Sequence, residues 1–326
     1  MLTEILILLA GLALVVLGAD WLVEGSSTIA RKAGLSEFVI GLTIVGLGTS
    51  MPELVVSLTG ALQGNADIAI GNIVGSNIFN ILLILGVTAL IRPLAMTRDN
   101  IRTDIPLNIV VTILLLFIGM HATLFGIGKE DTISRLDGVI FLLLFGCYMY
   151  WSFKHGKADE EEAEKDERKL WVAILMVLLG LGGLVFGGKV FVGSATQIAR
   201  MLHISDKFIA VTILAGGTSM PELVTCIVAA AKKKDQLALG NIIGSNIGNI
   251  LLILGVSALG YKVLPGNPSG LSFGGMTIVD MGVLIASGLL LLGSAYTGKG
   301  RKIDRADGII FLLCYAAYMF WLLQNL

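Results

Sequence analysis

The sequence predicts an all-α integral membrane protein with ten transmembrane helices, arranged as two inverted five-helix repeats. Composition is the first reason: 55% of the 326 residues are hydrophobic and 14% are charged, whereas roughly a quarter of the residues in a soluble domain are charged. The mean hydropathy is +0.87. The second reason is a succession of apolar segments, each long enough to cross a hydrocarbon core of about 30 Å as a helix. The third is that the second half of the sequence repeats the first.

The apolar segments leave few residues for a soluble domain. The first segment is not typical of a signal peptide, because Glu4 lies where a basic region is expected and the first basic residue is Arg31. We therefore expect it to be a true membrane span. The ten expected spans cover residues 2–23, 38–61, 66–90, 104–126, 136–153, 170–194, 207–231, 236–260, 275–296 and 306–323.

The internal repeat pairs the second and third spans with the seventh and eighth. Residues 41–90 align with residues 210–259 without a gap, and 29 of the 50 positions are identical. The fifth span matches the tenth at nearly the same offset. Because five spans are an odd number, the second half must enter the membrane from the opposite face. Secondary transporters are built in this way, and their substrate site lies near the bilayer midplane, between the repeats.

A charged linker at 154–169 separates the first repeat, 1–153, from the second, 170–326. It lacks the ligand spacing of a calcium-binding loop, so we interpret it as a solvated tether. The three cysteines show neither metal-ligand nor disulfide spacing. A net charge of −1 gives no basic surface for nucleic acid. No nucleophile–base pair or phosphate loop appears, so neither an enzyme nor a bound cofactor is expected.

The basic residues predict the orientation in the plasma (inner) membrane. If the N-terminus is outside, the cytoplasmic segments hold 17 of the 23 Lys and Arg residues. Cytoplasmic loops carry such an excess of basic residues. The sequence therefore predicts that both termini lie outside and that the linker is cytoplasmic.

The hexapeptide GTSMPE occurs at residues 48–53 and again at 217–222, each time inside an apolar span. Glu53 lies near the middle of its span, where an ionised side chain costs about 3 kcal/mol or more. Lys189 is the only basic residue expected within the membrane, and one lysine cannot neutralise two related glutamates. We infer that each glutamate meets a mobile cation.

The other residues of the hexapeptide favour a polar cavity. Pro52 has no N–H group, so the carbonyl group of Gly48 loses its helical partner. A freed carbonyl at membrane depth is tolerated where it lines a polar cavity. Thr49 and Ser50 share the helix face of Glu53 and add hydroxyl oxygens. The second copy supplies Gly217, Thr218, Ser219, Pro221 and Glu222.

A second repeated motif follows, GNIVGSNIFN at 71–80 and GNIIGSNIGN at 240–249. Asn77 and Asn246 lie one residue away from its polar stripe, on the side of a neighbouring helix. For these two and the first asparagine of each motif, hydrogen bonding between helices is the favoured role. For the serine and the last asparagine, ion binding is favoured. The stripe consists of Asn72, Ser76 and Asn80 in the first copy and Asn241, Ser245 and Asn249 in the second.

Together the two motifs offer oxygen ligands only. Carboxylate, hydroxyl, amide and backbone oxygens suit hard cations, Ca²⁺ and Na⁺ above all, whereas zinc and copper favour histidine and cysteine. Mg²⁺ is less suited because it gives up its water reluctantly. Two carboxylates neutralise one Ca²⁺ or two monovalent ions. Competition for this charge is a sufficient basis for exchange.

Both motifs resemble the α-repeats of the sodium/calcium exchanger family, part of the cation/calcium antiporter superfamily. The resemblance covers all ten spans, and the short linker is most similar to prokaryotic members that lack a large regulatory loop. It implies exchange of Ca²⁺ for Na⁺ by alternating access, with the first and sixth spans as a sliding gate. Asp20 and Lys189 lie at equivalent positions of those spans, either as a gate pair or at the membrane interface. The implied metal ligands are Glu53, Glu222, Thr49, Thr218, Ser50, Ser219, Asn80, Asn249, Ser76, Ser245 and the carbonyl groups of Gly46 and Ala215.

One departure from the family pattern leaves the driving ion open. Members of the family often have aspartate where this chain has Asn249, so the candidate site carries a charge of at most −2. A desolvated glutamate can carry a proton instead of meeting Na⁺. A Ca²⁺/H⁺ antiporter on the same scaffold is therefore the first alternative, and a cation channel is the second. The oligomeric state is not predicted.

Overall fold

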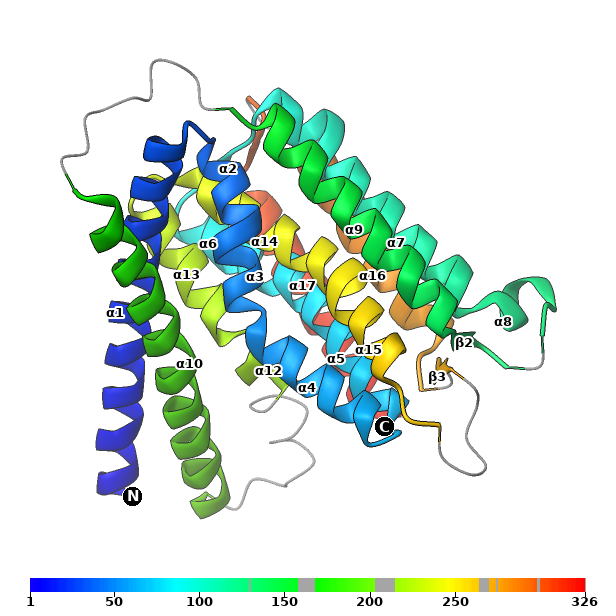
Figure 1. Ribbon diagram of the computed structural model, residues 1–326. Coiled ribbons are helices and arrows are strands. Elements are labelled where there is room, and N and C mark those ends of the chain that lie inside the picture. Colours follow the sequence, from blue (N-terminus) through cyan, green and yellow to red (C-terminus); the bar gives the residue numbers. More distant parts are fainter. Residues whose placement is uncertain are drawn as a thin grey trace. The chain divides into compact units, whose positions relative to one another are not determined.

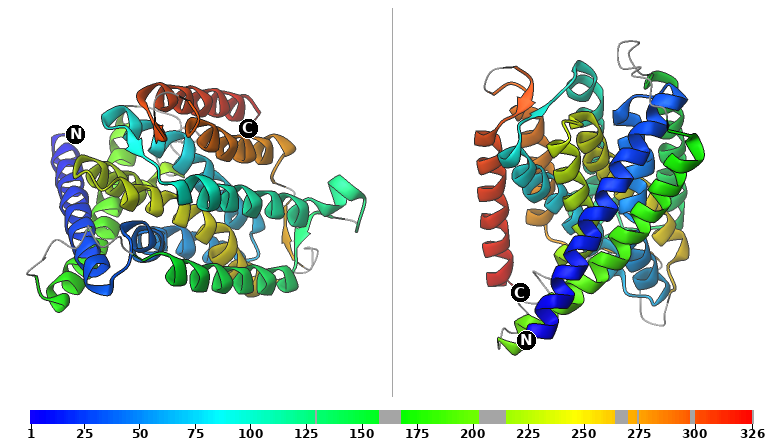
Figure 2. Two further views of the ribbon diagram at one scale, coloured as in Figure 1. Left: turned by 90° about the horizontal axis from the view of Figure 1, so that it is seen from above. Right: turned by 90° about the vertical axis from the view of Figure 1, so that its left-hand side faces the viewer.

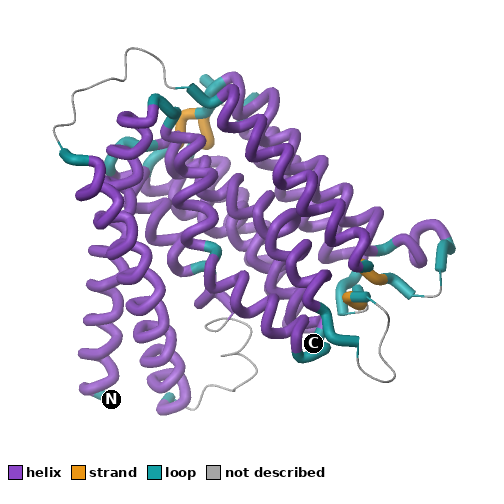
Figure 3. Tube along the Cα trace, in the orientation of Figure 1, coloured by secondary structure: helices purple, strands orange, loops and turns teal. Residues whose placement is uncertain are grey.

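The computed structural model describes residues 1–128, 130–157, 168–202, 215–263, 270–273, 275–297 and 300–325, and the described chain is almost entirely helical (Figures 1 and 3). Seven of its helices are long and apolar enough to cross a membrane, or eight if one bent pair counts as a single span. Two further apolar helices, α13 (Met220–Ala231) and α16 (Ile278–Ser294), are shorter. The chain is thus a multi-pass membrane protein, and the count of ten spans stays a prediction.

The third and eighth expected spans match the helices most closely. The chain is helical over Ala66–Ile91, which comprises α5 (Ala66–Ile78), the π-helix η2 (Phe79–Leu85) and α6 (Gly86–Ile91). It is helical again over Asp235–Gly260. The other long helices are α1 (Leu2–Ala33), η3 with α7 (Asn100–Asp104 and Ile105–Gly119), α9 (Arg135–His155), α10 (Leu170–Met201) and α17 (Arg305–Asn325).

The fourth span begins and ends earlier than expected. The side chains of Thr97 and Asn100 bond to each other's backbone N–H, at 3.1 Å and 2.8 Å, and this capping box starts the helix directly after Thr97. The helix ends at Gly119, and a separate short helix, α8 (His121–Phe125), follows. Of the seventh expected span, residues 207–214 lie outside the described residues.

The contacts divide the chain into two compact units. The first comprises residues 1–52 and 152–244, and the second comprises residues 53–151 and 245–326. Each unit takes residues from both halves of the sequence, so the compact units do not follow the linker at 154–169. The division into two five-helix repeats is a feature of the sequence and stays a prediction for the fold.

In the first unit, α1 and α10 run side by side along their length (Figures 1 and 2). Their backbones approach so closely that glycine is required at the contact. A Cβ atom at Gly18 would lie 2.7 Å from the carbonyl oxygen of Gly180, and one at Gly180 would lie 2.7 Å from that of Gly18. Small residues at such positions let membrane helices pack through their backbones. The remaining elements of this unit include α2 (Glu37–Ile40), η1 (Gly41–Val45), α3 (Gly46–Thr49) and α12 (Ala215–Thr218).

The second unit is held together by contacts that join the two sequence halves. Helix α17 packs on η2 and α6, and α16 packs on α7. Two antiparallel two-stranded ribbons link the halves: β1 (Leu94–Ala95) pairs with β4 (Lys302–Ile303), and β2 (Thr132–Ile133) pairs with β3 (Leu271–Ser272).

Candidate cation-binding site

The two GTSMPE segments interrupt their helices at the same position. Helix α3 ends at Thr49, Ser50 has φ −80° and ψ 9°, and α4 (Met51–Leu62) begins at the next residue. The helical segments on either side are bent by 50°. In the second copy, α12 ends at Thr218, Ser219 has φ −88° and ψ 10°, and α13 follows. The predicted break next to the proline is confirmed.

In the first unit, one hydroxyl group of the first hexapeptide contacts the carboxylate of the second. Ser50 Oγ donates to Glu222 Oε1 at 2.9 Å, and Glu222 is 1% exposed. Thr49 Oγ1 lies 3.3 Å from the carbonyl oxygen of Gly46 and 3.1 Å from Asn241 Oδ1. Both motifs therefore supply oxygen atoms to one buried cluster, although they are far apart in sequence.

In the second unit, Glu53 lies in the first turn of α4 and is also 1% exposed. Ser76 Oγ donates to Glu53 Oε1 at 3.4 Å. Asn72 Nδ2 lies 3.2 Å from the carbonyl oxygen of Glu53 and 2.9 Å from Ser57 Oγ. The serine predicted as a ligand thus does meet the glutamate, across two helices.

Asn72 and Asn241 have equivalent structural contacts. Asn241 Nδ2 lies 3.5 Å from the carbonyl oxygen of Glu222 and 3.4 Å from Cys226 Sγ. Cys226 occupies the position that Ser57 has in the first half. Each asparagine ties the start of a glutamate-bearing helix to the next helix. This is the helix-bonding role that the sequence favours for them.

Asn80 and Asn249 lie at the start of two π-helical segments, η2 and η6 (Asn249–Leu254). Single π-helical turns are frequent at functional sites. Both residues are 1% exposed. Asn80 Nδ2 donates to Asn246 Oδ1 at 2.9 Å, and Asn249 Nδ2 donates to Asn77 Oδ1 at 2.9 Å. Sequence reasoning placed Asn77 and Asn246 against a neighbouring helix but did not anticipate that they bond to the candidate ligands.

The remaining candidate ligands are placed as follows. Ser219 and Ser245 are buried. Thr218 Oγ1 is buried and has no hydrogen-bond partner among the residues that the structure describes. Ala215 begins α12, and its side chain lies outside the described residues.

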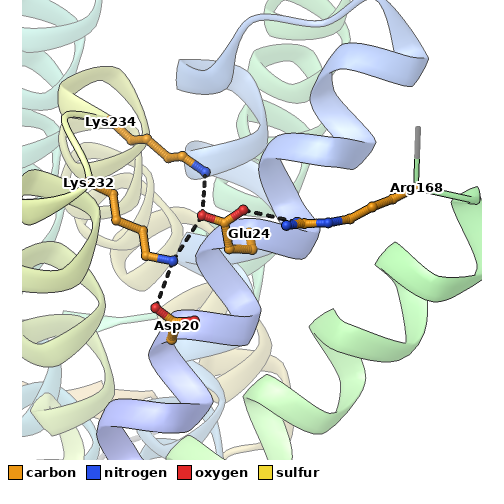
Figure 4. Close-up of polar contacts among 5 residues, drawn as sticks. All are labelled: Asp20, Glu24, Arg168, Lys232 and Lys234. Carbon is orange, nitrogen blue, oxygen red and sulfur yellow. Dashed lines mark hydrogen bonds and ion pairs between the residues drawn. The ribbon is translucent and has the colours of Figure 1, made fainter. Parts of the chain in front are cut away.

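Asp20 does not pair with Lys189, which is exposed on α10. Figure 4 shows a cluster in which Lys232 Nζ lies 2.7 Å from Asp20 Oδ1 and 2.9 Å from Glu24 Oε1. Arg168, at the end of the linker, is 2.9 Å from Glu24 Oε2. Burial alone would lower the pKa of Lys232, but its hydrogen bonds to the two carboxylates outweigh burial and raise it. This cluster connects α1 to the turn after α13.

The donor set agrees with hard-cation chemistry. In each unit, the buried glutamate of one GTSMPE motif lies next to hydroxyl and amide groups. Among the described residues, no three His, Cys, Asp or Glu side chains gather in one place, so the remaining oxygen donors are hydroxyl, amide and carbonyl groups. Calcium and sodium accept such mixed oxygen ligands.

Known proteins are similar to this chain over nearly its whole length. A model of the sodium/calcium exchanger protein family matches residues 3–154 and 172–324. The membrane protein MJ0091 of Methanocaldococcus jannaschii is 39% identical over 308 residues, 94% of each chain. The sodium/calcium exchanger MaX1 of Methanosarcina acetivorans is 35% identical and covers 96% of this chain and 97% of its own. A solved structure of the sodium-calcium exchanger NCX_Mj is similar with a TM-score of 0.80 and 35% identity, covering 97% of each chain.

Proposed function

The chain belongs to the sodium/calcium exchanger protein family, and from this premise we propose that it exchanges Ca²⁺ for Na⁺ by alternating access to a site near the bilayer midplane. It is a multi-pass membrane cation/calcium antiporter. The coupling to Na⁺, the ten-span inverted arrangement and the outside position of both termini are parts of the proposal. Extrusion of Ca²⁺ is the expected direction.

One observation supports the proposal most strongly: the 2.9 Å hydrogen bond between Ser50 and Glu222. These residues come from the two copies of one motif, so both halves contribute to a single oxygen cluster. We propose that Glu53 acts on the same transported ion. The other ligands are the hydroxyl, amide and carbonyl groups predicted from the motifs.

The exchange follows from charge. Two carboxylates balance one Ca²⁺, and they balance two monovalent ions equally well. Because the site cannot hold both sets of ions at once, binding of one set displaces the other. A carboxylate whose charge no cation balances would be costly inside the membrane, so the site favours reorientation only when it is loaded.

A Ca²⁺/H⁺ antiporter is the second candidate, and Asn249 is the observation that favours it. The amide of Asn249 donates to Asn77 and adds no charge to the site. Two glutamates are enough to carry two protons against one Ca²⁺. Sodium coupling remains first because MaX1 and NCX_Mj are named as sodium/calcium exchangers.

The deciding experiment is ⁴⁵Ca²⁺ flux into proteoliposomes under separate Na⁺, K⁺ and H⁺ gradients. Uptake driven by an outward Na⁺ gradient, and lost when choline replaces Na⁺, supports the proposal. Uptake driven by a pH gradient without Na⁺ supports the second candidate. Flux that follows the electrochemical gradient of Ca²⁺ with no counter-ion would indicate a channel and contradict both.

A further inference from the structure

Four buried asparagines in the second unit form a closed hydrogen-bond network. Asn77 and Asn246 bond to each other's backbone: Asn77 Nδ2 donates to the carbonyl oxygen of Asn246 at 3.1 Å, and Asn246 Nδ2 donates to that of Asn77 at 3.3 Å. Their side-chain oxygens accept from Asn249 and Asn80, each at 2.9 Å. The four residues are 0–1% exposed. The two pairs occupy equivalent positions of the repeat.

We propose that Asn77 and Asn246 are positioning residues, which turn the amides of Asn249 and Asn80 so that their carbonyl oxygens are available to the transported ion. The inference rests on the proposed function, because it takes Asn80 and Asn249 as ion ligands. It goes beyond that function by naming two further residues on which ion affinity depends.

The orientation of each amide follows from its partners. A backbone carbonyl can only accept a hydrogen bond, so the group that Asn77 turns toward Asn246 must be its NH₂. The oxygen of Asn77 then faces Asn249, which must present its own NH₂ in return. The oxygen of Asn249 is thereby directed away from Asn77. The same argument, starting from the backbone carbonyl of Asn77, determines the orientation of the Asn246 amide and then that of the Asn80 amide.

The side-chain oxygens of Asn80 and Asn249, which take no part in this network, indicate a bound ligand. Asn80 Oδ1 and Asn249 Oδ1 are buried, and neither has a hydrogen-bond partner among the residues that the structure describes. Buried polar atoms are nearly always satisfied, because leaving one unpaired is costly. A hard cation would satisfy both oxygens, and amide oxygens are ordinary ligands of Ca²⁺.

The partnership is crossed, and this makes it testable. Asn77 acts on Asn249, which is 172 residues away, and not on Asn80, which is three residues away. Asn246 likewise acts on Asn80. A merely structural asparagine would affect both amides alike. A positioning residue loses its effect only when its own target amide has been removed.

Double-mutant cycles test this crossing. The two readouts are ⁴⁵Ca²⁺ binding to purified protein, which gives the affinity, and ⁴⁵Ca²⁺ exchange in proteoliposomes, which gives the concentration for half-maximal uptake. We expect Asn77→Ala to weaken Ca²⁺ affinity ~10-fold in the wild-type chain. In an Asn80→Ala background the same ~10-fold loss should persist. In an Asn249→Ala background it should shrink to about twofold or less.

The mirror cycle provides an independent check. Asn246→Ala should lose its effect in the Asn80→Ala background and keep it in the Asn249→Ala background. It also keeps the proposal testable if Asn77→Ala does not fold, which size-exclusion chromatography would reveal.

The outcomes separate the inference from the function on which it rests. Equal effects of Asn77→Ala in both backgrounds would overturn the inference while leaving exchange intact. Crossed coupling in the binding assay without any exchange would support the inference and contradict the proposed function. Absence of Ca²⁺ binding by the wild-type protein would contradict both.

Discussion

Glu53 and Glu222 each accept a hydrogen bond from a serine hydroxyl at one carboxyl oxygen. Glutamine keeps the shape of the side chain and that acceptor oxygen, but it removes the negative charge that balances the ion. We therefore expect Glu53→Gln and Glu222→Gln each to lower ⁴⁵Ca²⁺ exchange by ~100-fold or more, since losing a ligand should cost at least as much as losing its supporting partner. The amount of folded protein in the membrane should not change.

A matched substitution controls for the chemistry of this change. Glu130 is exposed, in the loop before α9, so Glu130→Gln should exchange Ca²⁺ at the wild-type rate. Retained exchange in both Glu53→Gln and Glu222→Gln, measured at equal protein amounts, would show that the two glutamates do not bind the transported ion.

Asn249→Asp tests the amide network at another residue. An ionised aspartate has no NH₂ to donate, so its oxygen would face the side-chain oxygen of Asn77, which is also an acceptor. A protonated aspartate can donate and restores the bond. We expect the variant to exchange Ca²⁺ better in acid than in alkaline buffer, relative to wild type. The measurement is flux from pH 6 to pH 8 with the Na⁺ gradient held constant. A profile parallel to that of wild type would show that the hydrogen bond from Asn249 to Asn77 does not control exchange.

The sequence allowed a site residue to be predicted only where the evidence for it lies within a single helix. Glu53 and Ser76 were identifiable because a charge and a polar stripe stand out in an apolar helix. The contact between Ser50 and Glu222 joins residues 172 positions apart, so spacing along one helix could not reveal it. The role of Asn77 was equally hidden, because it depends on which backbone carbonyl its side chain meets.

At the scale of elements, the contact between α1 and α10 should be sensitive to a single methyl group. A Cβ at Gly18 would lie 2.7 Å from a backbone oxygen, and backbone cannot move aside easily. We expect Gly18→Ala to destabilise the protein by about 1–3 kcal/mol. Its thermal unfolding in detergent should occur at a lower temperature than that of wild type.

Gly182 is the matched control for this substitution. It lies on α10, and a Cβ there would meet nothing within 4 Å. Alanine is favoured over glycine in a helix by about 1 kcal/mol, so Gly182→Ala should unfold at the wild-type temperature or above. If both variants behaved alike, the close approach of the two backbones would not limit stability.

Hydropathy predicts where a helix crosses the membrane better than where it ends. The first expected span ends at residue 23, whereas α1 continues to Ala33. Its last three turns are more polar, yet Ser26, Ser27 and Thr28 are fully buried. The helix ends where Gly34 adopts the left-handed conformation, with φ 65°. The glycine was visible in the sequence, but the burial of the preceding polar turn was not. The π-helical turns likewise have no signature in hydropathy.

For the whole molecule, the distribution of basic residues makes a prediction about orientation. In a chain without its native cysteines, Lys157→Cys in the linker should react with a membrane-impermeant maleimide only from the cytoplasmic side. Asn325→Cys, near the C-terminus, should react from outside. The experiment uses right-side-out and inverted vesicles. The opposite pattern would reverse the predicted orientation while leaving the even number of spans possible.

The repeat is also recognisable at this scale as a set of equivalent contacts. A Cβ at Gly308 would lie 2.8 Å from the carbonyl oxygen of Gly86, and one at Gly138 would lie 2.8 Å from that of Gly255. These pairs are related by the offset of 169–170 residues that aligns the two halves. The sequence predicted that the halves are alike. It could not predict that the last helix of each half packs against an inner helix of the opposite half.

The ribbons and glycine contacts of the second unit have a consequence for biosynthesis. When the ribosome has made the first half, the residues of β1 and α9 have been synthesised, but those of β4 and α15 (Gly255–Gly260), on which they pack, have not yet been translated. Until the last helices are synthesised, these surfaces are exposed to incorrect contacts with other parts of the chain or with other proteins. A gene cut within the linker should accordingly yield a working transporter only when one cell makes both fragments.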